Sequence, residues 1–148
     1  MSDLLYKFVS EKKNNPLAPE WKYYMWESID KDIDYDFLKE FILDKEKEIL
    51  SKPVSQYDGK FTDGHTGLGK DSLTSRFQNY NFLKFENKEI DKIKKLIIDT
   101  HEKFLKALKL DIKSKFYVQC WVNVMRKGEQ IKPHLHDVSP NSYLGGHL

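Results

Sequence analysis

The stretch that decides the fold is "KFYVQCWVNVMRKGEQIKPHLHD", residues 115–137. Residues 116–125 alternate between two kinds of side chain, which predicts a β-strand because successive strand side chains point to opposite faces. One face is apolar and belongs against a core. The other mixes aromatic rings with amides, which fits either the wall of a ligand cavity or a half-solvated sheet face. The apolar face comprises Phe116, Val118, Cys120, Val122 and Val124, and the mixed face comprises Tyr117, Gln119, Trp121, Asn123 and Met125.

Two histidines with the spacing of metal ligands follow this strand. Gly128 predicts a turn, and Pro133 then precedes His134 and His136. Residues two apart on an extended strand point to the same side, so both imidazoles can reach a single metal ion. Imidazole suits Zn, Cu, Fe and Ni, so the spacing alone leaves the metal open. We predict that His134 and His136 are metal ligands, whereas Asp137 falls on the opposite face.

The C-terminal part of the sequence resembles a known family. "CWVNVMRKGEQIKPHLHDVSPNSYLGGHL", residues 120–148, is similar to the iron(II)/2-oxoglutarate-dependent oxygenases, in particular to a subfamily common in phage genomes. The shared pattern is a Trp-x-Asn strand, a turn glycine, Pro-His-x-His and a strand like "SYLGG". "LTSRFQNYNFLKF", residues 73–85, looks like the segment that precedes the family's long helix, so the resemblance covers about residues 65–148.

The resemblance implies roles for four residues. His134 corresponds to the first iron ligand, and His136 stands where the wider family has an acid. Asn123 and Tyr143 match positions that line the pocket of the co-substrate, 2-oxoglutarate. The family's second histidine and its arginine or lysine for the co-substrate carboxylate have no counterpart at the family's spacing. His147 could in principle be a third ligand, because it shares a face with Tyr143, but its distance from His136 also departs from that spacing.

The resemblance implies an α+β fold in which N-terminal helices support a double-stranded β-helix barrel of the jelly-roll or cupin-like kind. We expect a single domain over residues 1–148, helical over about 1–110, with the barrel core starting over about 115–148. After His136 only "SYLGGHL" is available as a further strand. We therefore expect an incomplete barrel that belongs to a longer oxygenase or is closed by another chain.

Two amphipathic helices are predicted upstream. Apolar residues recur at three- and four-residue steps from Asp34 to about Leu50, and Asp34 or Asp36 can cap this helix. A second apolar stripe runs from about Asn87 to Leu108, and we interpret His101, close to that stripe, as an ordinary packing residue. The second stripe comprises Ile90, Ile93, Ile97, Phe104, Leu105 and Leu108. Before both helices, the proline-containing segment "NNPLAPEWKYYMWES" is predicted to be irregular or extended, with Trp21, Tyr24 and Trp26 packed over something.

One glycine-rich segment imitates a nucleotide-binding loop. "GHTGLGKDS", residues 64–72, has the spacing of a phosphate loop, but such a loop needs a buried strand before it and a hydroxyl residue after the lysine. The preceding "SQYDGKFTD" is polar, and Asp71 occupies the hydroxyl position. We expect a surface or lid loop without a nucleotide.

Composition limits the class of protein. The chain has 148 residues, 25 basic and 23 acidic, with a net charge of +2, so no basic stripe for nucleic acid is expected. Cys120 is the only cysteine, which excludes an internal disulfide and is compatible with a reducing compartment. Neither a signal peptide nor a run of 18 apolar residues is present, so we expect a soluble cytoplasmic protein without a membrane partner.

The expected function is that of an iron(II)/2-oxoglutarate-dependent dioxygenase, with a small molecule or a protein side chain such as proline as substrate. Two alternatives belong to other classes. One is a non-catalytic, cupin-like module that binds a metal or a small molecule. The other is a structural or assembly protein whose C-terminal edge strand pairs with another copy or a partner. Binding of 2-oxoglutarate separates the first alternative from the oxygenase, and loss of all metal binding would favour the second.

Overall fold

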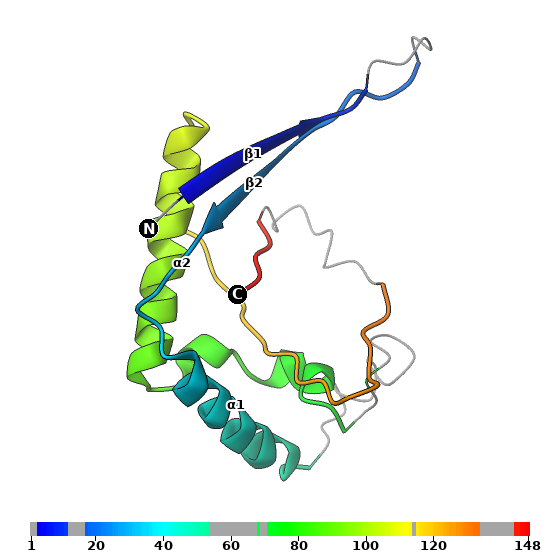
Figure 1. Ribbon diagram of the computed structural model, residues 1–148, viewed down its shortest axis with the longest axis vertical. Coiled ribbons are helices and arrows are strands. Elements are labelled where there is room, and N and C mark those ends of the chain that lie inside the picture. The colour runs from blue at the N-terminus through cyan, green and yellow to red at the C-terminus, as the bar shows by residue number, and fades with distance from the viewer. Residues whose placement is uncertain (1–2, 12–16, 54–67, 69–70, 114, 134–143) are drawn as a thin grey trace. The chain divides into compact units, whose positions relative to one another are not determined.

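The computed structural model describes residues 3–11, 17–53, 68, 71–113, 115–133 and 144–148. These residues form a small α+β structure with two α-helices, two short 3-10 helices and a two-stranded antiparallel sheet that is not closed (Figure 1). The chain divides into two compact units, one of residues 1–38 and 85–118 and the other of residues 39–84 and 119–148.

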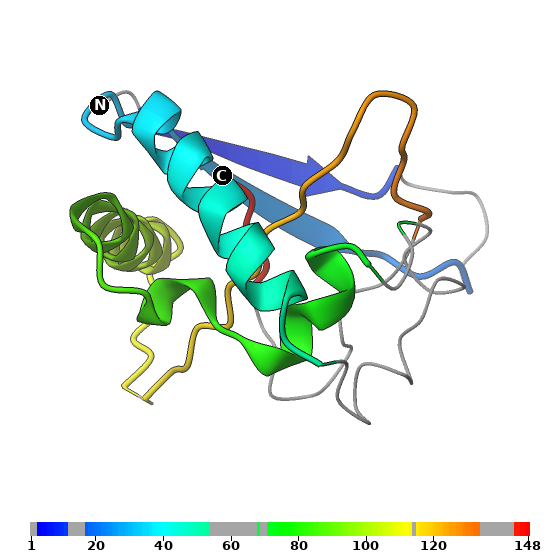
Figure 2. The same ribbon diagram turned by 90° about the horizontal axis from the view of Figure 1, so that it is seen from below.

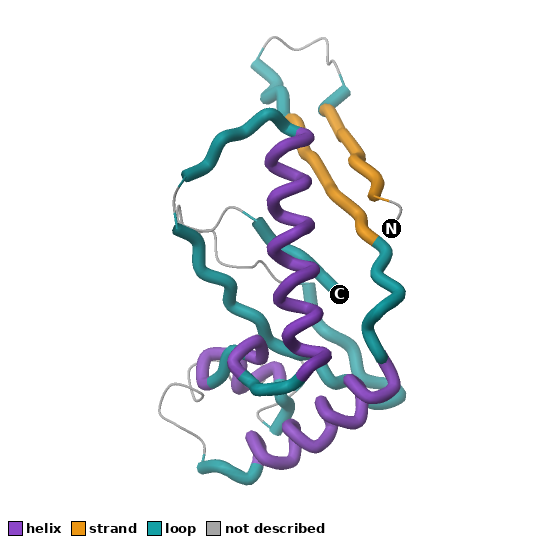
Figure 3. The backbone as a smooth tube through the Cα atoms, turned by 90° about the vertical axis from the view of Figure 1, so that its left-hand side faces the viewer, coloured by secondary structure: helices purple, strands orange, loops and turns teal. Residues whose placement is uncertain are grey.

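Both predicted helices are confirmed within one or two residues. Helix α1 covers Tyr35–Leu50 and helix α2 covers Lys88–Ala107 (purple in Figure 3). Asp34 caps α1, because its Oδ1 accepts the backbone N–H of Phe37 at 3.0 Å. The side chain of Asn87 caps α2 in the same way and accepts the N–H of Glu89 at 2.8 Å. These bonds satisfy donors that have no partner inside a helix.

The first unit begins with a β-hairpin that the sequence analysis did not predict. Strand β1 covers Asp3–Val9 and strand β2 covers Lys22–Ser28, and they pair antiparallel with Asp3 opposite Ser28 and Val9 opposite Lys22. Figures 1 and 2 show the two strands side by side. The expectation of a helical region over residues 1–110 was therefore wrong at its start. Neither strand alternates apolar with polar residues, so the period-2 pattern was missing.

One face of the hairpin packs on α2. The Trp26 ring lies 6.3 Å from that of Phe104, which confirms that Trp26 packs over another element. Lys103 Nζ pairs with Asp3 Oδ2 at 2.8 Å, and Ser28 Oγ donates to Asp3 Oδ1 at 2.7 Å. A sheet of two strands is marginal in water by itself, so these contacts support it.

The core of the first unit follows the predicted apolar stripe of α2. Its buried side chains are Ile33, Leu38, Ile90, Ile93 and Phe104. His101, at the edge of the stripe, lies with its ring 4.5 Å from that of Phe116. The interpretation of His101 as a packing residue is thus confirmed.

The second unit is built around two 3-10 helices, η2 over Thr74–Asn79 and η3 over Phe82–Lys84. Phe82 is buried, and its ring lies edge-on to that of Phe41 in α1 with centroids 6.1 Å apart. Further along the chain, Arg126 pairs with the buried Glu46 through two bonds of 2.8 and 2.6 Å. This bidentate pair ties the segment after residue 119 to α1.

The predicted strand over residues 116–125 is not a strand in the structure. The described residues from 115 to 133 form loops and one turn, drawn in teal in Figure 3, and residues 144–148 likewise form no strand. The alternation nevertheless survives in the burial, because Val118, Cys120, Val122 and Val124 are half-buried while most of their neighbours are exposed. The predicted alternation is therefore kept in part, since Phe116 is exposed and Trp121 is half-buried, and no neighbouring strand among the described residues completes a hydrogen-bonded ladder.

Within the described residues, neither α1 nor α2 combines the length and the apolar character that a membrane crossing requires.

Candidate functional site

The site predicted from the sequence is only partly covered by the structure. His134, His136 and Tyr143 lie outside the described residues, as does most of the glycine-rich segment 64–72. Asn123 is described, and its side chain is exposed. The geometry of the candidate site is therefore built outward from Asn123.

The segment that carries Asn123 is held by the turn between η2 and η3. The backbone N–H of Phe82 donates to the carbonyl of Cys120 at 2.8 Å, and Asn81 Oδ1 accepts the N–H of Cys120 at 3.3 Å. Figures 1 and 2 show the two segments next to each other, the first in green and the second in gold. A single turn with its side chains thus takes the place of a partner strand.

Tyr80 completes this attachment. Its hydroxyl accepts the N–H of Val122 at 3.1 Å and donates to the carbonyl of the same residue at 3.4 Å. Its own carbonyl accepts a bond of 2.8 Å from Gln119 Nε2. Burial raises the pKa of Tyr80 to about 12, so the phenol stays protonated and keeps its donor at neutral pH. The N–H and the carbonyl of Val122, the residue before Asn123, are therefore both satisfied by the side chain of Tyr80.

The side chain of Asn123 is fixed by Thr74. Thr74 is 4% exposed, and its Oγ1 donates to Asn123 Oδ1 at 2.9 Å. Thr74 begins η2 directly after Leu73, which is fully buried, so the hydroxyl is held by a packed element. Thr74 was not predicted from the sequence as a site residue, although it lies in the segment 73–85 that carries part of the family resemblance.

The two arginines of the chain both lie in the second unit. Arg76, in η2, is 4% exposed, and its Nη1 donates to the carbonyl of Lys52 at 3.5 Å. Arg126 is engaged by Glu46, whose hydrogen bonds raise the pKa of the guanidinium. Arg126 thus serves as a structural partner of α1.

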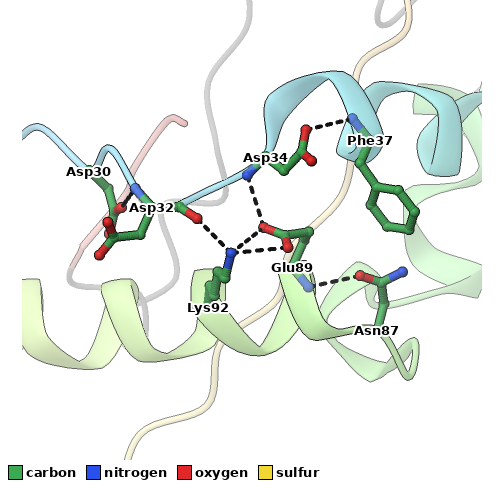
Figure 4. Close-up of polar contacts among 7 residues, drawn as sticks. All are labelled: Asp30, Asp32, Asp34, Phe37, Asn87, Glu89 and Lys92. Carbon is green, nitrogen blue, oxygen red and sulfur yellow. Dashed lines mark hydrogen bonds and ion pairs between the residues drawn. The ribbon is translucent and has the colours of Figure 1, made fainter.

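A cluster of acidic side chains in the first unit has a structural role (Figure 4). The carboxylate of Glu89, 1% exposed, accepts the N–H of Asp34 at 2.9 Å and Lys92 Nζ at 3.0 Å. Lys92 also donates to the carbonyl of Asp32 at 2.5 Å. The bond from Asp34 and then that from Lys92 hold the pKa of Glu89 below its usual value. Lys92 therefore balances the negative charge of Glu89. These contacts attach the loop before α1 to α2.

Cys120 does not have the surroundings of a nucleophile. Its side chain is half-buried, and burial raises the pKa of its thiol. The thiolate is the reactive form of cysteine, so this environment disfavours the reactive form of Cys120. Across the part of the chain that the structure describes, no group of three or more His, Cys, Asp and Glu side chains is placed to hold a metal ion.

Comparison of the chain with descriptions of known protein families, with curated proteins and with solved structures finds no match in any of the three. The residues that the structure brings together are Asn123, Thr74 and the turn of Tyr80, which combine an exposed amide with buried groups that fix it.

Proposed function

We propose that the chain is an iron(II)/2-oxoglutarate-dependent dioxygenase in which His134 and His136 hold the metal, and Asn123 and Tyr143 lie beside the co-substrate. The observation that supports this proposal is the position of Asn123. It is the described member of the predicted site, it is exposed, its side chain is held by a hydrogen bond from Thr74, and the backbone of the adjacent Val122 is held by Tyr80. Binding residues need such fixed geometry, and a side chain with only a surface role does not.

The predicted ligands fit iron by their chemistry. Two imidazoles two residues apart supply nitrogen donors of the kind that iron(II) accepts. When bound, iron(II) and 2-oxoglutarate would supply an oxidation in which O₂ gives one oxygen atom to succinate, formed with CO₂, and the other to a C–H bond of the substrate. The sheet of the described residues has two strands and is not a barrel. The jelly-roll barrel is therefore part of this proposal.

The chain's own residues would bind and orient the co-substrate. Asn123 offers an uncharged hydrogen-bonding group at a fixed place, and Tyr80 holds the backbone on which it sits. By analogy with the family, the proposed substrate is a small molecule or a protein side chain such as proline. This assignment rests on fold-level resemblance alone.

The metal ligands are tested by iron(II) binding under anaerobic conditions. We expect one iron(II) per chain in the wild-type protein and an affinity at least about tenfold weaker in His134→Ala and in His136→Ala, because each substitution removes one donor. His101→Ala, at the histidine that packs against Phe116, is the matched control and should bind like the wild type. Iron binding that is equal in all four proteins would contradict the assignment.

The same preparation separates the other classes of function. Iron bound through His134 without any effect of 2-oxoglutarate would indicate a cupin-like binding module. An absence of iron binding in the wild-type protein would favour a structural or assembly role.

A further inference from the structure

The hydrogen bond between Thr74 and Asn123 bears on the orientation of the Asn123 amide as well as on its position. We propose that Thr74 is a positioning residue that fixes the amide of Asn123 so that its NH₂ group donates a hydrogen bond to a carboxylate oxygen of the co-substrate. This inference rests on the proposed function and adds a residue to the site.

The orientation of the amide follows from the proton of Thr74. The buried hydroxyl has one proton to donate, and Asn123 Oδ1 accepts it at 2.9 Å. Among the described residues, Asn123 Oδ1 is the one acceptor of this proton. If the amide were reversed, its NH₂ group would face the hydroxyl, whose own proton would then be buried without an acceptor. The contact therefore selects one of the two orientations of the amide.

The selected orientation leaves the NH₂ group available. Asn123 is exposed, and its Nδ2 has no hydrogen-bond partner within the described part of the chain. An amide NH₂ is a donor only, and a carboxylate is an acceptor only, so the two are complementary. The arrangement favours an acceptor oxygen, such as that of a carboxylate, over a group that can only donate, such as ammonium.

The donor is fixed before any ligand arrives. Thr74 holds the side chain of Asn123, and Tyr80 holds the backbone of the adjacent Val122 through both its N–H and its carbonyl. A ligand that meets a donor already in place does not have to order it, and this strengthens binding.

The test measures the affinity of the iron(II)-loaded protein for 2-oxoglutarate by anaerobic calorimetry. Without the hydroxyl, in Thr74→Val, the amide has two orientations and up to three χ1 rotamers, of which one is competent. We therefore expect binding about two- to sixfold weaker than in the wild type. Thr74→Ser keeps the hydroxyl and should bind like the wild type.

Two further variants separate positioning from a general loss of stability. Asn123→Ala should weaken binding by about tenfold or more, because it removes a hydrogen bond to a charged group. In the double variant Thr74→Val/Asn123→Ala, the substitution of Thr74 should have no further effect. Asn123→Asp keeps the acceptor for Thr74 but replaces the NH₂ group by an anionic oxygen, so it should bind even more weakly than Asn123→Ala.

The side-chain ¹⁵N resonance of Asn123 gives an independent readout. It should shift on addition of 2-oxoglutarate in the wild type and in Thr74→Ser. Wild-type affinity in Thr74→Val would overturn the role of Thr74, and wild-type affinity in Asn123→Asp would overturn the contact between the NH₂ group and the co-substrate. Either result would leave the proposed dioxygenase activity standing. A wild-type protein that binds iron(II) but no 2-oxoglutarate would overturn both the inference and the proposed function.

Discussion

Tyr80 makes two hydrogen bonds that a neighbouring strand would otherwise provide. Both go to Val122, one to its N–H and one to its carbonyl. Tyr80→Phe keeps the ring but removes both bonds, so we expect a loss of about 1–3 kcal/mol in the free energy of unfolding. Chemical denaturation at neutral pH measures this difference. Tyr23→Phe, at an exposed position in β2, is the control and should change little.

Tyr80 also predicts how stability changes in alkaline solution. Its pKa in the folded protein, about 12, lies above the usual value of 10.0, so its contribution is complete below pH 10 and is lost as the pH rises toward 12. The stability of the wild-type protein should therefore fall between these values, and that of Tyr80→Phe should fall less. Parallel slopes for the two proteins would contradict this role of Tyr80.

Glu89 makes the corresponding prediction on the acid side. Its folded-state pKa is held below the usual value of 4.5, so its contribution is present above that value and is lost as the pH falls through the lower, folded-state pKa. Glu89→Gln cannot ionise, so its stability should depend less on pH in this range. Denaturation curves from pH 6 downward check this, with Glu102→Gln on the exposed face of α2 as control. Equal pH dependence in the wild type and Glu89→Gln would refute it.

At the scale of elements, the start of α2 depends on one side chain. The side chain of Asn87 accepts the N–H of Glu89, and the backbone of Asn87 is extended, with φ −163° and ψ 139°. Asn87→Ala should cost about 0.5–2 kcal/mol in the free energy of unfolding, as loss of an N-cap does elsewhere. Urea denaturation measures this cost. Asn87→Asp retains a cap acceptor, so its free energy of unfolding should remain close to that of the wild type. A larger loss of stability in Asn87→Asp than in Asn87→Ala would exclude a capping role.

The helices could be predicted because their evidence is local. Apolar residues at three- and four-residue steps and a cap residue before them mark both α1 and α2 within the sequence itself. The hairpin β1–β2 could not be predicted in this way, because aromatic and aliphatic residues occupy both of its faces. For residues 116–125 the alternation is kept from Val118 to Val124 on the apolar face, but a strand also needs a partner, and the described bonds of this segment go to Tyr80, Asn81 and Phe82.

At the scale of the whole molecule, the candidate site combines parts of the chain that are distant in sequence. Asn123 was predicted from a motif, since Trp121 and Asn123 stand at the spacing of the family pattern. Thr74 lies 49 residues earlier and was missed, because nothing in the local sequence shows which distant amide its hydroxyl will meet. The two histidines at positions 134 and 136 remain a prediction from their spacing.

The central claim is that iron(II) and 2-oxoglutarate bind together at a site that includes His134. Anaerobic titration with iron(II), with and without 2-oxoglutarate, tests it through the weak visible charge-transfer band that a metal-bound 2-oxo acid produces. We predict a band in the wild-type protein that needs both components and is absent in His134→Ala. A wild-type protein that gives no band with both components present, or a band that persists unchanged in His134→Ala, would contradict the account.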